Sequence, residues 1–469
     1  MENVRNFFFN KKTLLYSSVT AQIITFIILF VQATISAQYR LAYGDAAFAL
    51  FRLCADKTFF CPHNRYIAVF SEYLPLLGIY LQLSFKHIAI LYSNNLVFTS
   101  FILWGIYLLL TKKWEHGWIF ISSQIIGLFE GYNHFVLEQV GYIFVCFFIL
   151  LLDYVLSEKN KQNYLLAITT FAICLSAPTM HMNSLVVLCV GYTYLFFVHH
   201  KAYKFLIIHT ILVLISIILF RKYISSFNVY EVSKLSAIQE NLKNIYHLDQ
   251  SGYSQYFKVN YTPNEYLRNF YILIVILCLY YRKWMILLMI IAFYFICFYF
   301  NCLLFNNWET SGYMEYYGEF IFISILIGLY FALKNHSKNW VVLLFYIYIF
   351  HFSLENIYAH QKRYRDREIY IHQLCQNLRK NNKSKAYIFK KDIDYQKLFL
   401  DWALPYESMN SSLYRDEKLV SLYAIEDSTQ MKNLSDEEIV SNVSIDKTSN
   451  FKTNYYGSIK NEPYAIYKP

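Results

Sequence analysis

The sequence predicts an all-α polytopic membrane protein with about eleven transmembrane helices and a small C-terminal α/β domain outside the cytoplasm. Three observations lead to this fold class. Hydrophobic residues make up 57% of the 469 residues and charged residues only 16%, whereas typical soluble domains have roughly 45–50% and 25%. Apolar segments of membrane-spanning length recur from Thr13 almost to Ile357. From His360 onward the chain turns polar.

The first apolar segment, 13–36, follows Arg5, Lys11 and Lys12 and could be mistaken for a signal peptide. It is too long and has no convincing small-residue cleavage site, so we interpret it as a retained signal anchor. The predicted spans are 13–36, 89–110, 118–129, 139–156, 164–177, 184–198, 203–220, 267–281, 284–305, 320–333 and 340–357.

The charges of the short connections predict the orientation, because Lys and Arg near the ends of spans favour the cytoplasmic side. One set of ends carries Arg5, Lys11, Lys12, Lys112, Lys113, Lys159, Lys161, Lys201, Lys204, Arg282, Lys283, Lys334 and Lys338. The alternate connections, 130–138, 178–183 and 306–319, contain no Lys or Arg. We therefore expect a multi-pass protein of the cell (inner) membrane with a cytoplasmic N-terminus and an extracytoplasmic C-terminal domain.

This alternation requires the apolar stretch 66–84 to lie at the outer interface rather than to cross the membrane. Glu72 and Pro75 interrupt it, which favours one or two interfacial helices. The predicted organisation is a transmembrane domain, 1–358, with large outside loops at 37–87 and 221–266, followed by a soluble domain, 359–469.

In the C-terminal domain, the sequence predicts a helical stretch through Arg379 and short strands near 386–389, 419–425 and 464–467. The basic residues that open this domain most simply contact anionic lipid headgroups; they are Lys362, Arg363, Arg365 and Arg367.

Several function classes are disfavoured by the sequence. The net charge of +10 reports membrane topology rather than nucleic-acid binding, and we expect no nucleic-acid partner. The nine cysteines show no CxxC pair and no metal-ligand spacing, and Cys54 and Cys61 share one outside loop, where a disulfide would be compatible with the topology. A Gly-rich phosphate loop of a transport ATPase is absent from the sequence.

Asp45 is the most informative residue, because it lies in an outside loop shortly after the first span. A carboxylate held just above the membrane can accept a proton from an incoming hydroxyl group. The alternative is that Asp45 caps the helix that starts after it, as Asp often does. The two roles are compatible.

The order of motifs around Asp45 resembles that of the GT-C membrane glycosyltransferases. Residues 45–51 are followed by His63-Asn64-Arg65, by Leu74-Pro75-Leu76-Leu77 and by the second span. Protein O-mannosyltransferases and lipid A aminoarabinose transferases have a similar acidic residue, Pro-Leu segment and second span in that order. Here the family's usual double proline is reduced to Pro75, and Asp45 has no adjacent acidic partner.

The resemblance implies a glycosyltransferase that moves a hexosyl or pentosyl group from a polyprenyl-phosphate carrier to an extracytoplasmic lipid, glycan or protein acceptor. Asp45 would activate the acceptor, and the donor would bind between the membrane and the outside domain. The partners are then the lipid-linked sugar donor, membrane lipids and the acceptor.

A second group of polar residues lies in the outside turn 130–138. If the turn is helical, Glu130, His134 and Glu138 share one face through their i, i+4 spacing. Such a cluster can bind a divalent cation or assist the acid–base step, so we take Glu130 and Glu138 as catalytic candidates. Interfacial polar residues facing water explain the same pattern, and we therefore assign no metal ligand.

Basic residues on the outside are candidates for binding the lipid phosphate. Arg221 and Lys222 lie at the predicted outer end of the seventh span and are exceptions to the charge rule. Both can supply charge-assisted hydrogen bonds to phosphate. Contact with lipid headgroups is the alternative for this pair. The remaining substrate-binding candidates, each also compatible with a structural role, are His63, Arg65, His134, His181 and Arg268.

Two other functions fit a chain with many spans. A transporter or flippase for lipid-linked glycans predicts paired ionisable residues near mid-membrane and related repeats of spans, whereas the charged residues here cluster at span ends. A non-catalytic assembly protein for envelope polysaccharides would show no dependence of sugar transfer on Asp45.

Overall fold

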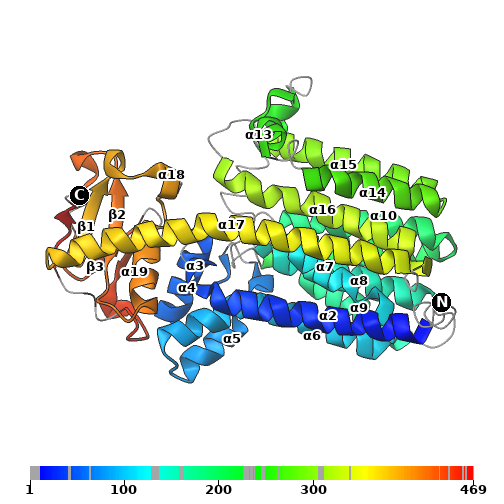
Figure 1. The fold of residues 1–469 in the computed structure, drawn as a ribbon, viewed down its shortest axis with the longest axis horizontal. Helices are drawn as coiled ribbons and strands as arrows, with labels where there is room; N and C mark the ends of the chain where they lie inside the picture. The colour runs from blue at the N-terminus through cyan, green and yellow to red at the C-terminus, as the bar shows by residue number, and fades with distance from the viewer. Residues whose placement is uncertain are drawn as a thin grey trace, which may run out of the picture.

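The computed structural model shows a helical bundle with a smaller mixed domain at one end (Figure 1). It describes residues 11–40, 44–62, 65–127, 137–157, 163–224, 232, 236, 238–243, 249–260, 265–304, 311–336, 340–398, 400–432, 434–441, 444–456, 459 and 462–467. The N-terminus and the C-terminal domain lie at opposite ends of the molecule (Figure 1).

Each predicted span coincides with a helix. The helices of the bundle are α2 (Lys11–Ile35), α6 (Phe85–Thr111), α7 (Trp118–Gly127), α8 (Leu137–Ser157), α9 (Asn163–Ser176), α10 (Met182–Val198), α11 (Tyr203–Tyr223), α14 (Glu265–Tyr280), α15 (Trp284–Leu304), α16 (Ser311–Leu333) and α17 (Trp340–Lys380), with α13 (Gly252–Asn260) beside α15 and α16. Short 3-10 turns join several of them: η3 (Trp114–His116), η4 (Ala177–Thr179), η5 (His200–Ala202) and η8 (Lys334–His336).

Within the described residues, five helical segments are long and apolar enough to cross a membrane. They are Tyr16–Ile35, Phe85–Thr111, Val140–Ser157, His200–Tyr223 and Trp284–Leu304. A multi-pass membrane protein is therefore confirmed at this level by the length and composition of its helices. The other predicted spans coincide with helices that are shorter or only partly described, so the full number of about eleven stays a prediction.

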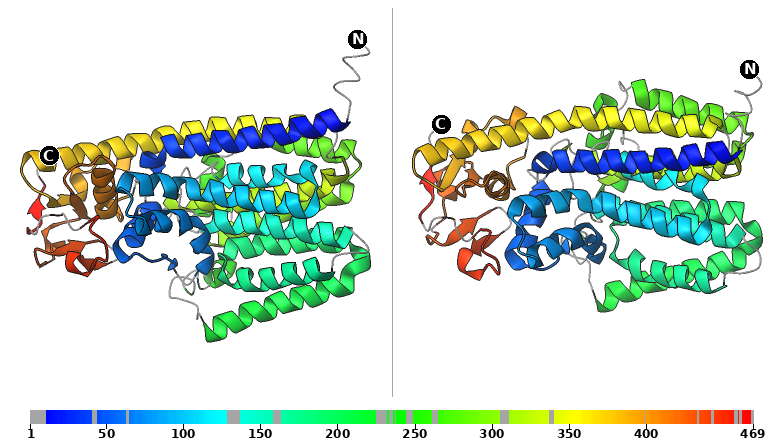
Figure 2. Two further views of the ribbon diagram at one scale, coloured as in Figure 1. Left: turned by 90° about the horizontal axis from the view of Figure 1, so that it is seen from below. Right: turned by 60° about the horizontal axis from the view of Figure 1, so that its bottom comes forward.

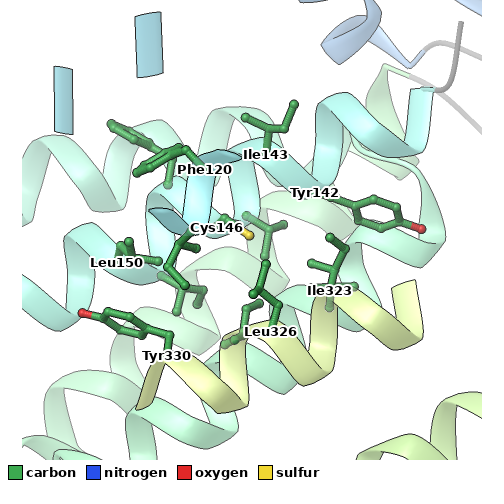
Figure 3. Close-up of a cluster of buried hydrophobic side chains, with 14 of the residues drawn as sticks. Phe120, Tyr142, Ile143, Cys146, Leu150, Ile323, Leu326 and Tyr330 are labelled. Atoms are coloured by element: carbon green, nitrogen blue, oxygen red, sulfur yellow. The ribbon is translucent and has the colours of Figure 1, made fainter. Parts of the chain in front are cut away.

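The centre of the bundle is packed with apolar side chains from α7, α8 and α16 (Figure 3). Ile143, Cys146 and Leu150 of α8 face Ile323 and Leu326 of α16, and all of them are buried. Cys146 thus behaves as a small hydrophobic residue, as expected for a cysteine inside an apolar span. All nine cysteines are free thiols, including Cys54 and Cys61, so the disulfide considered for the first outside loop does not form in this structure.

A polar cluster joins the helix ends that the charge rule places in the cytoplasm. Asp153 of α8 accepts hydrogen bonds from Lys334 (2.5 Å), from the His199 ring (2.7 Å) and from the Tyr330 hydroxyl (2.7 Å). The Tyr330 ring also lies edge-on to His116 in η3. These residues lie in or next to four connections predicted to be inside, so the folded chain brings together the ends that the charges assign to one side.

The connection between α2 and α6 forms a group of short helices at the other end of the bundle (Figure 2). It contains α3 (Ala37–Arg40), α4 (Gly44–Asp56), η2 (Tyr66–Ala68) and α5 (Val69–Tyr80). Because α5 has only 12 residues, it is too short to span a bilayer. Its length agrees with the interfacial role predicted for 66–84.

The C-terminal domain is a small α/β fold, in agreement with the strands predicted from the sequence. A parallel sheet has the order β2 (Ser421–Ile425), β1 (Lys385–Phe389), β5 (Ala465–Ile466), and an antiparallel pair is formed by β3 (Glu438–Val440) and β4 (Ile445–Lys447). The domain also contains α18 (Tyr395–Leu398), α19 (Leu404–Tyr414), η9 (Lys390–Asp392), η10 (Ser428–Gln430) and η11 (Thr448–Asn450). Apolar residues of α17, α19, β1 and β2 form its core.

Helix α17 connects the bundle to the C-terminal domain without interruption. It has 41 residues, runs beside α2 along the bundle and continues past the predicted domain boundary at 358 into the C-terminal domain (Figures 1 and 2). At about 1.5 Å per residue, such a helix is roughly 60 Å long. The C-terminal domain is therefore attached to the bundle by a continuous helix rather than by a loop.

Candidate functional site

The short helix that carries Asp45 packs directly on the C-terminal domain. The rings of Phe48 and Phe51 lie 4.9 Å and 4.7 Å from the ring of Tyr406 in α19, measured between centroids. Arg52 forms an ion pair of 2.9 Å with Asp446. One hydrophobic cluster contains buried residues of α4, α5, α6, α19 and the C-terminal tail. The connection between α2 and α6 and the C-terminal domain therefore share one core.

The N-terminal end of α4 is held from the C-terminal domain. The backbone N–H of Gly44, the first residue of α4, donates a hydrogen bond of 2.7 Å to the carboxylate of Glu407 in α19. Gly44 has a φ of +40°, a value that favours glycine. The indole of Trp402 lies against Gly44, since a Cβ placed there would be 3.7 Å from it.

Glu407 is itself held by a buried ion pair. Nη2 of Arg367 in α17 lies 2.8 Å and 2.7 Å from the two carboxylate oxygens of Glu407 and also donates to the carbonyl of Leu400. Both charged side chains are fully buried. Burial raises the pKa of Glu407, and the charge of Arg367 and the hydrogen bond from the Gly44 N–H oppose this shift. Membrane headgroups are therefore not the contact of Arg367, and the prediction that the whole basic run faces lipid is wrong at this residue.

The neighbouring residue of α17 makes a second ion pair at the same interface. Glu368 is buried and accepts hydrogen bonds from Arg415 (2.9 Å), from Ser411 (2.9 Å) and from Gln38 of α3 (2.6 Å). Arg367 thus reaches α4 through Glu407, whereas Glu368 binds Gln38 of α3 directly. Two successive residues of α17 are therefore linked to the beginning of the connection between α2 and α6.

Asp45 is the second residue of α4 and lies inside its first turn. Its side chain is half-buried, and its two sequence neighbours, Gly44 and Ala46, are both buried. A carboxylate in the first turn interacts favourably with the helix dipole. Because the helix begins at Gly44 and the Gly44 N–H is bound by Glu407, Asp45 does not precede the helix as the capping alternative supposed.

A second carboxyl group acts electrostatically on the same buried tyrosine as Asp45. Asp45 and Glu72 both interact electrostatically with Tyr92, which is fully buried in α6. Glu72 accepts a hydrogen bond of 2.7 Å from the Phe60 N–H, and within the described structure its other oxygen is buried without a hydrogen-bond partner. Burial raises the pKa of Glu72 well above its ordinary value, although the bond from Phe60 opposes the shift.

The other candidate residues are distributed unevenly over the described structure. Arg65 is buried and precedes η2. His181 is buried and caps α10, where its ring accepts a bond from the Asn183 N–H, which is a structural role. Arg221 and Lys222 lie in the last turn of α11, and Lys222 is exposed.

Several candidates stay predictions. His63, Glu130 and His134 lie outside the described residues, and of Glu138 and Arg268 only the backbone is described, in α8 and α14. The described part of the chain contains no group of three or more His, Cys, Asp or Glu residues that could hold a metal ion. The cation site considered for 130–138 therefore stays a prediction too.

Sequence reasoning missed two residues of this site, Glu407 and Glu72, and it did not assign Glu368 to the neighbouring interface with α3. Glu407 and Glu368 belong to a polar domain, where an acidic residue is ordinarily expected at the surface, and their partners are distant in sequence. Gly44 could have indicated the start of α4, because a glycine directly before an acidic residue is compatible with a positive φ at the beginning of a helix.

No family model, no curated protein and no solved structure matches this chain. The fold and the site define a class: a multi-pass helical membrane protein in which the first large connection and the C-terminal domain form one folded unit at the end of the bundle.

Proposed function

We propose that this protein is a membrane glycosyltransferase that uses a polyprenyl-phosphate sugar donor and an extracytoplasmic acceptor. The single observation that carries the proposal is the position of Asp45. Its half-buried carboxylate lies in the first turn of α4, where the end of the bundle meets the C-terminal domain. The order of motifs in the first loop of this chain resembles that of the GT-C enzymes, and a similar acidic residue is expected in the corresponding loop of those enzymes.

In the proposed reaction, Asp45 takes the proton from a hydroxyl group of the acceptor. The acceptor oxygen then forms a bond to the anomeric carbon of the donor sugar. The bond between this carbon and the phosphate oxygen breaks, and its electron pair leaves with the polyprenyl phosphate. A general base of this kind typically contributes about 10²–10⁴-fold to the rate.

The test is sugar turnover in membranes that contain equal amounts of the wild-type protein or of Asp45→Asn, with a panel of polyprenyl-linked sugars. We expect the substitution to lower kcat by at least about 100-fold. Asp56→Asn is the matched control: Asp56 ends the same helix, its side chain is 45% exposed, and its ion pair with Arg52 is long, at 4.0 Å. Equal turnover by wild type and Asp45→Asn would remove Asp45 as the base.

A further inference from the structure

We propose that Glu407 is a positioning residue, which sets the start of α4 and thereby the place of Asp45 from within the C-terminal domain. The inference rests on the proposed function, because a positioning role requires that Asp45 acts on a substrate. It adds Glu407 and Arg367, which come from a different part of the chain, to the residues that determine the geometry of the site.

The geometry at the start of α4 leads to this inference. The first N–H groups of a helix have no acceptor within the helix, and the N–H of Gly44 is bound by Glu407 instead, at 2.7 Å. Gly44 also has the left-handed φ of +40°, so the chain can turn sharply there. Glu407 consequently holds the backbone of the residue immediately before Asp45.

The carboxylate of Glu407 has little freedom to move. Its two oxygens are bound by Arg367 at 2.8 Å and 2.7 Å, and neither side chain is exposed. Arg367 belongs to α17, which runs from the bundle into the C-terminal domain (Figure 1). The start of α4 is thereby linked to the last long helix of the bundle through two charged side chains.

The neighbouring pair Glu368–Arg415 supplies a matched control. It lies at the same interface and is also fully buried at its carboxylate. Its contact with the first loop is Gln38 of α3, several residues before α4. Removing this pair therefore perturbs the same interface without removing the acceptor of the Gly44 N–H.

The experiment compares three variants of the full-length protein in lipid vesicles. Arg367→Met/Glu407→Leu removes the acceptor without leaving an unpaired buried charge, and such apolar replacements of both partners are often tolerated. Glu407→Gln keeps an oxygen that can accept from Gly44. Glu368→Met/Arg415→Met is the control.

We expect the first variant, Arg367→Met/Glu407→Leu, to lose roughly 10–100-fold in kcat with an unchanged KM, because small displacements of reacting groups are costly. We expect Glu407→Gln to recover part of this loss and the control to keep the wild-type kcat.

Hydrogen exchange at the Gly44 amide provides a readout that does not depend on sugar transfer. We expect exchange at least about 10-fold faster in Arg367→Met/Glu407→Leu than in wild type, and unchanged exchange in the control. Faster exchange with a wild-type kcat would overturn the positioning role and leave the proposed function intact. An equal loss of kcat in the control would also overturn it, since the effect would then belong to the interface as a whole. If wild type transfers no sugar, the proposed function and the positioning role both fail, and the exchange data alone show whether Glu407 holds α4.

Discussion

The backbone N–H of Leu74 donates a hydrogen bond to the side chain of Asn95, with a distance of 2.8 Å between nitrogen and oxygen. Leu74 immediately precedes Pro75, which lies inside α5 and has no N–H of its own. The amide nitrogen of Asn95 donates to the carbonyl of Phe70 at 2.7 Å. Asn95 thus binds both backbone groups that a regular helix would pair with each other, and it fastens α5 to α6.

We expect Asn95→Leu to lower the free energy of unfolding by roughly 1–3 kcal/mol, because the N–H of Leu74 loses its side-chain acceptor in a buried place. Unfolding in mixed detergent micelles measures this difference. Asn94→Leu is the control: Asn94 is only half-buried and bonds to Thr34 and to the Ile90 carbonyl of its own helix, so a change below about 0.5 kcal/mol is expected. Equal losses in the two variants would contradict the bridging role of Asn95.

The largely buried pair Asp153–Lys334 leads to a second prediction. Removing one partner of a buried ion pair typically costs roughly 3–5 kcal/mol, because the other charge loses its compensation. We expect a loss of this size for Asp153→Asn. We expect smaller losses for Lys334→Met, in which Asp153 keeps its bonds from His199 and Tyr330, and for Asp153→Leu/Lys334→Met. The measurement is the free energy of unfolding in mixed micelles. The exposed Lys201 supplies the control Lys201→Met, and single-variant losses as small as the loss in that control would contradict the prediction.

The parts of the fold that follow from local composition could be predicted from the sequence. Apolar stretches of sufficient length coincide with helices, and short runs of β-forming residues such as 419–425 coincide with strands of the C-terminal domain. Burial of polar residues could not be predicted, because it depends on partners far along the chain. Arg367 illustrates this: its sequence neighbours suggest a surface run, whereas the fold pairs it with Glu407 in a dry interface.

The candidate site was predicted only at Asp45. Its position after the first span predicts that it lies at the outer end of the bundle, and the structure shows that its helix packs against the C-terminal domain. The acidic partners at this end, Glu72 and Glu407, come from α5 and α19. A single sequence contains no information on which acidic residues of distant elements meet, so neither could be assigned to the site in advance.

Glu72 leads to a prediction about pH. Its folded-state pKa is raised by burial from an ordinary value of 4.5, so the unfolded chain ionises first as the pH rises. Between the two pKa values the folded state binds more protons, and the free energy of unfolding falls by up to about 1.4 kcal/mol per pH unit. We expect Glu72→Gln to remove this decline and to be more stable than wild type at neutral pH.

Thermal unfolding of wild type and Glu72→Gln between pH 4 and pH 8 provides the measurement, with about half-unit steps to resolve the slope. Glu437→Gln is the control, because Glu437 is exposed in the C-terminal domain. Parallel curves for wild type and Glu72→Gln would show that Glu72 is ionised in the folded protein.

The final prediction concerns the side of the membrane on which Asp45 lies. The shared core of α4 and α19 and the Gly44–Glu407 bond place Asp45 on the same side as the C-terminal domain. A label on that domain therefore also reports the side of Asp45. We expect a membrane-impermeant maleimide to label Ser435→Cys in intact cells and to label Lys201→Cys only after permeabilisation, because both positions are exposed and the charge rule assigns them to opposite sides. The parent protein with its native cysteines gives the background. The reverse pattern would place Asp45 in the cytoplasm, and sugar transfer to an extracytoplasmic acceptor by this residue would then be impossible.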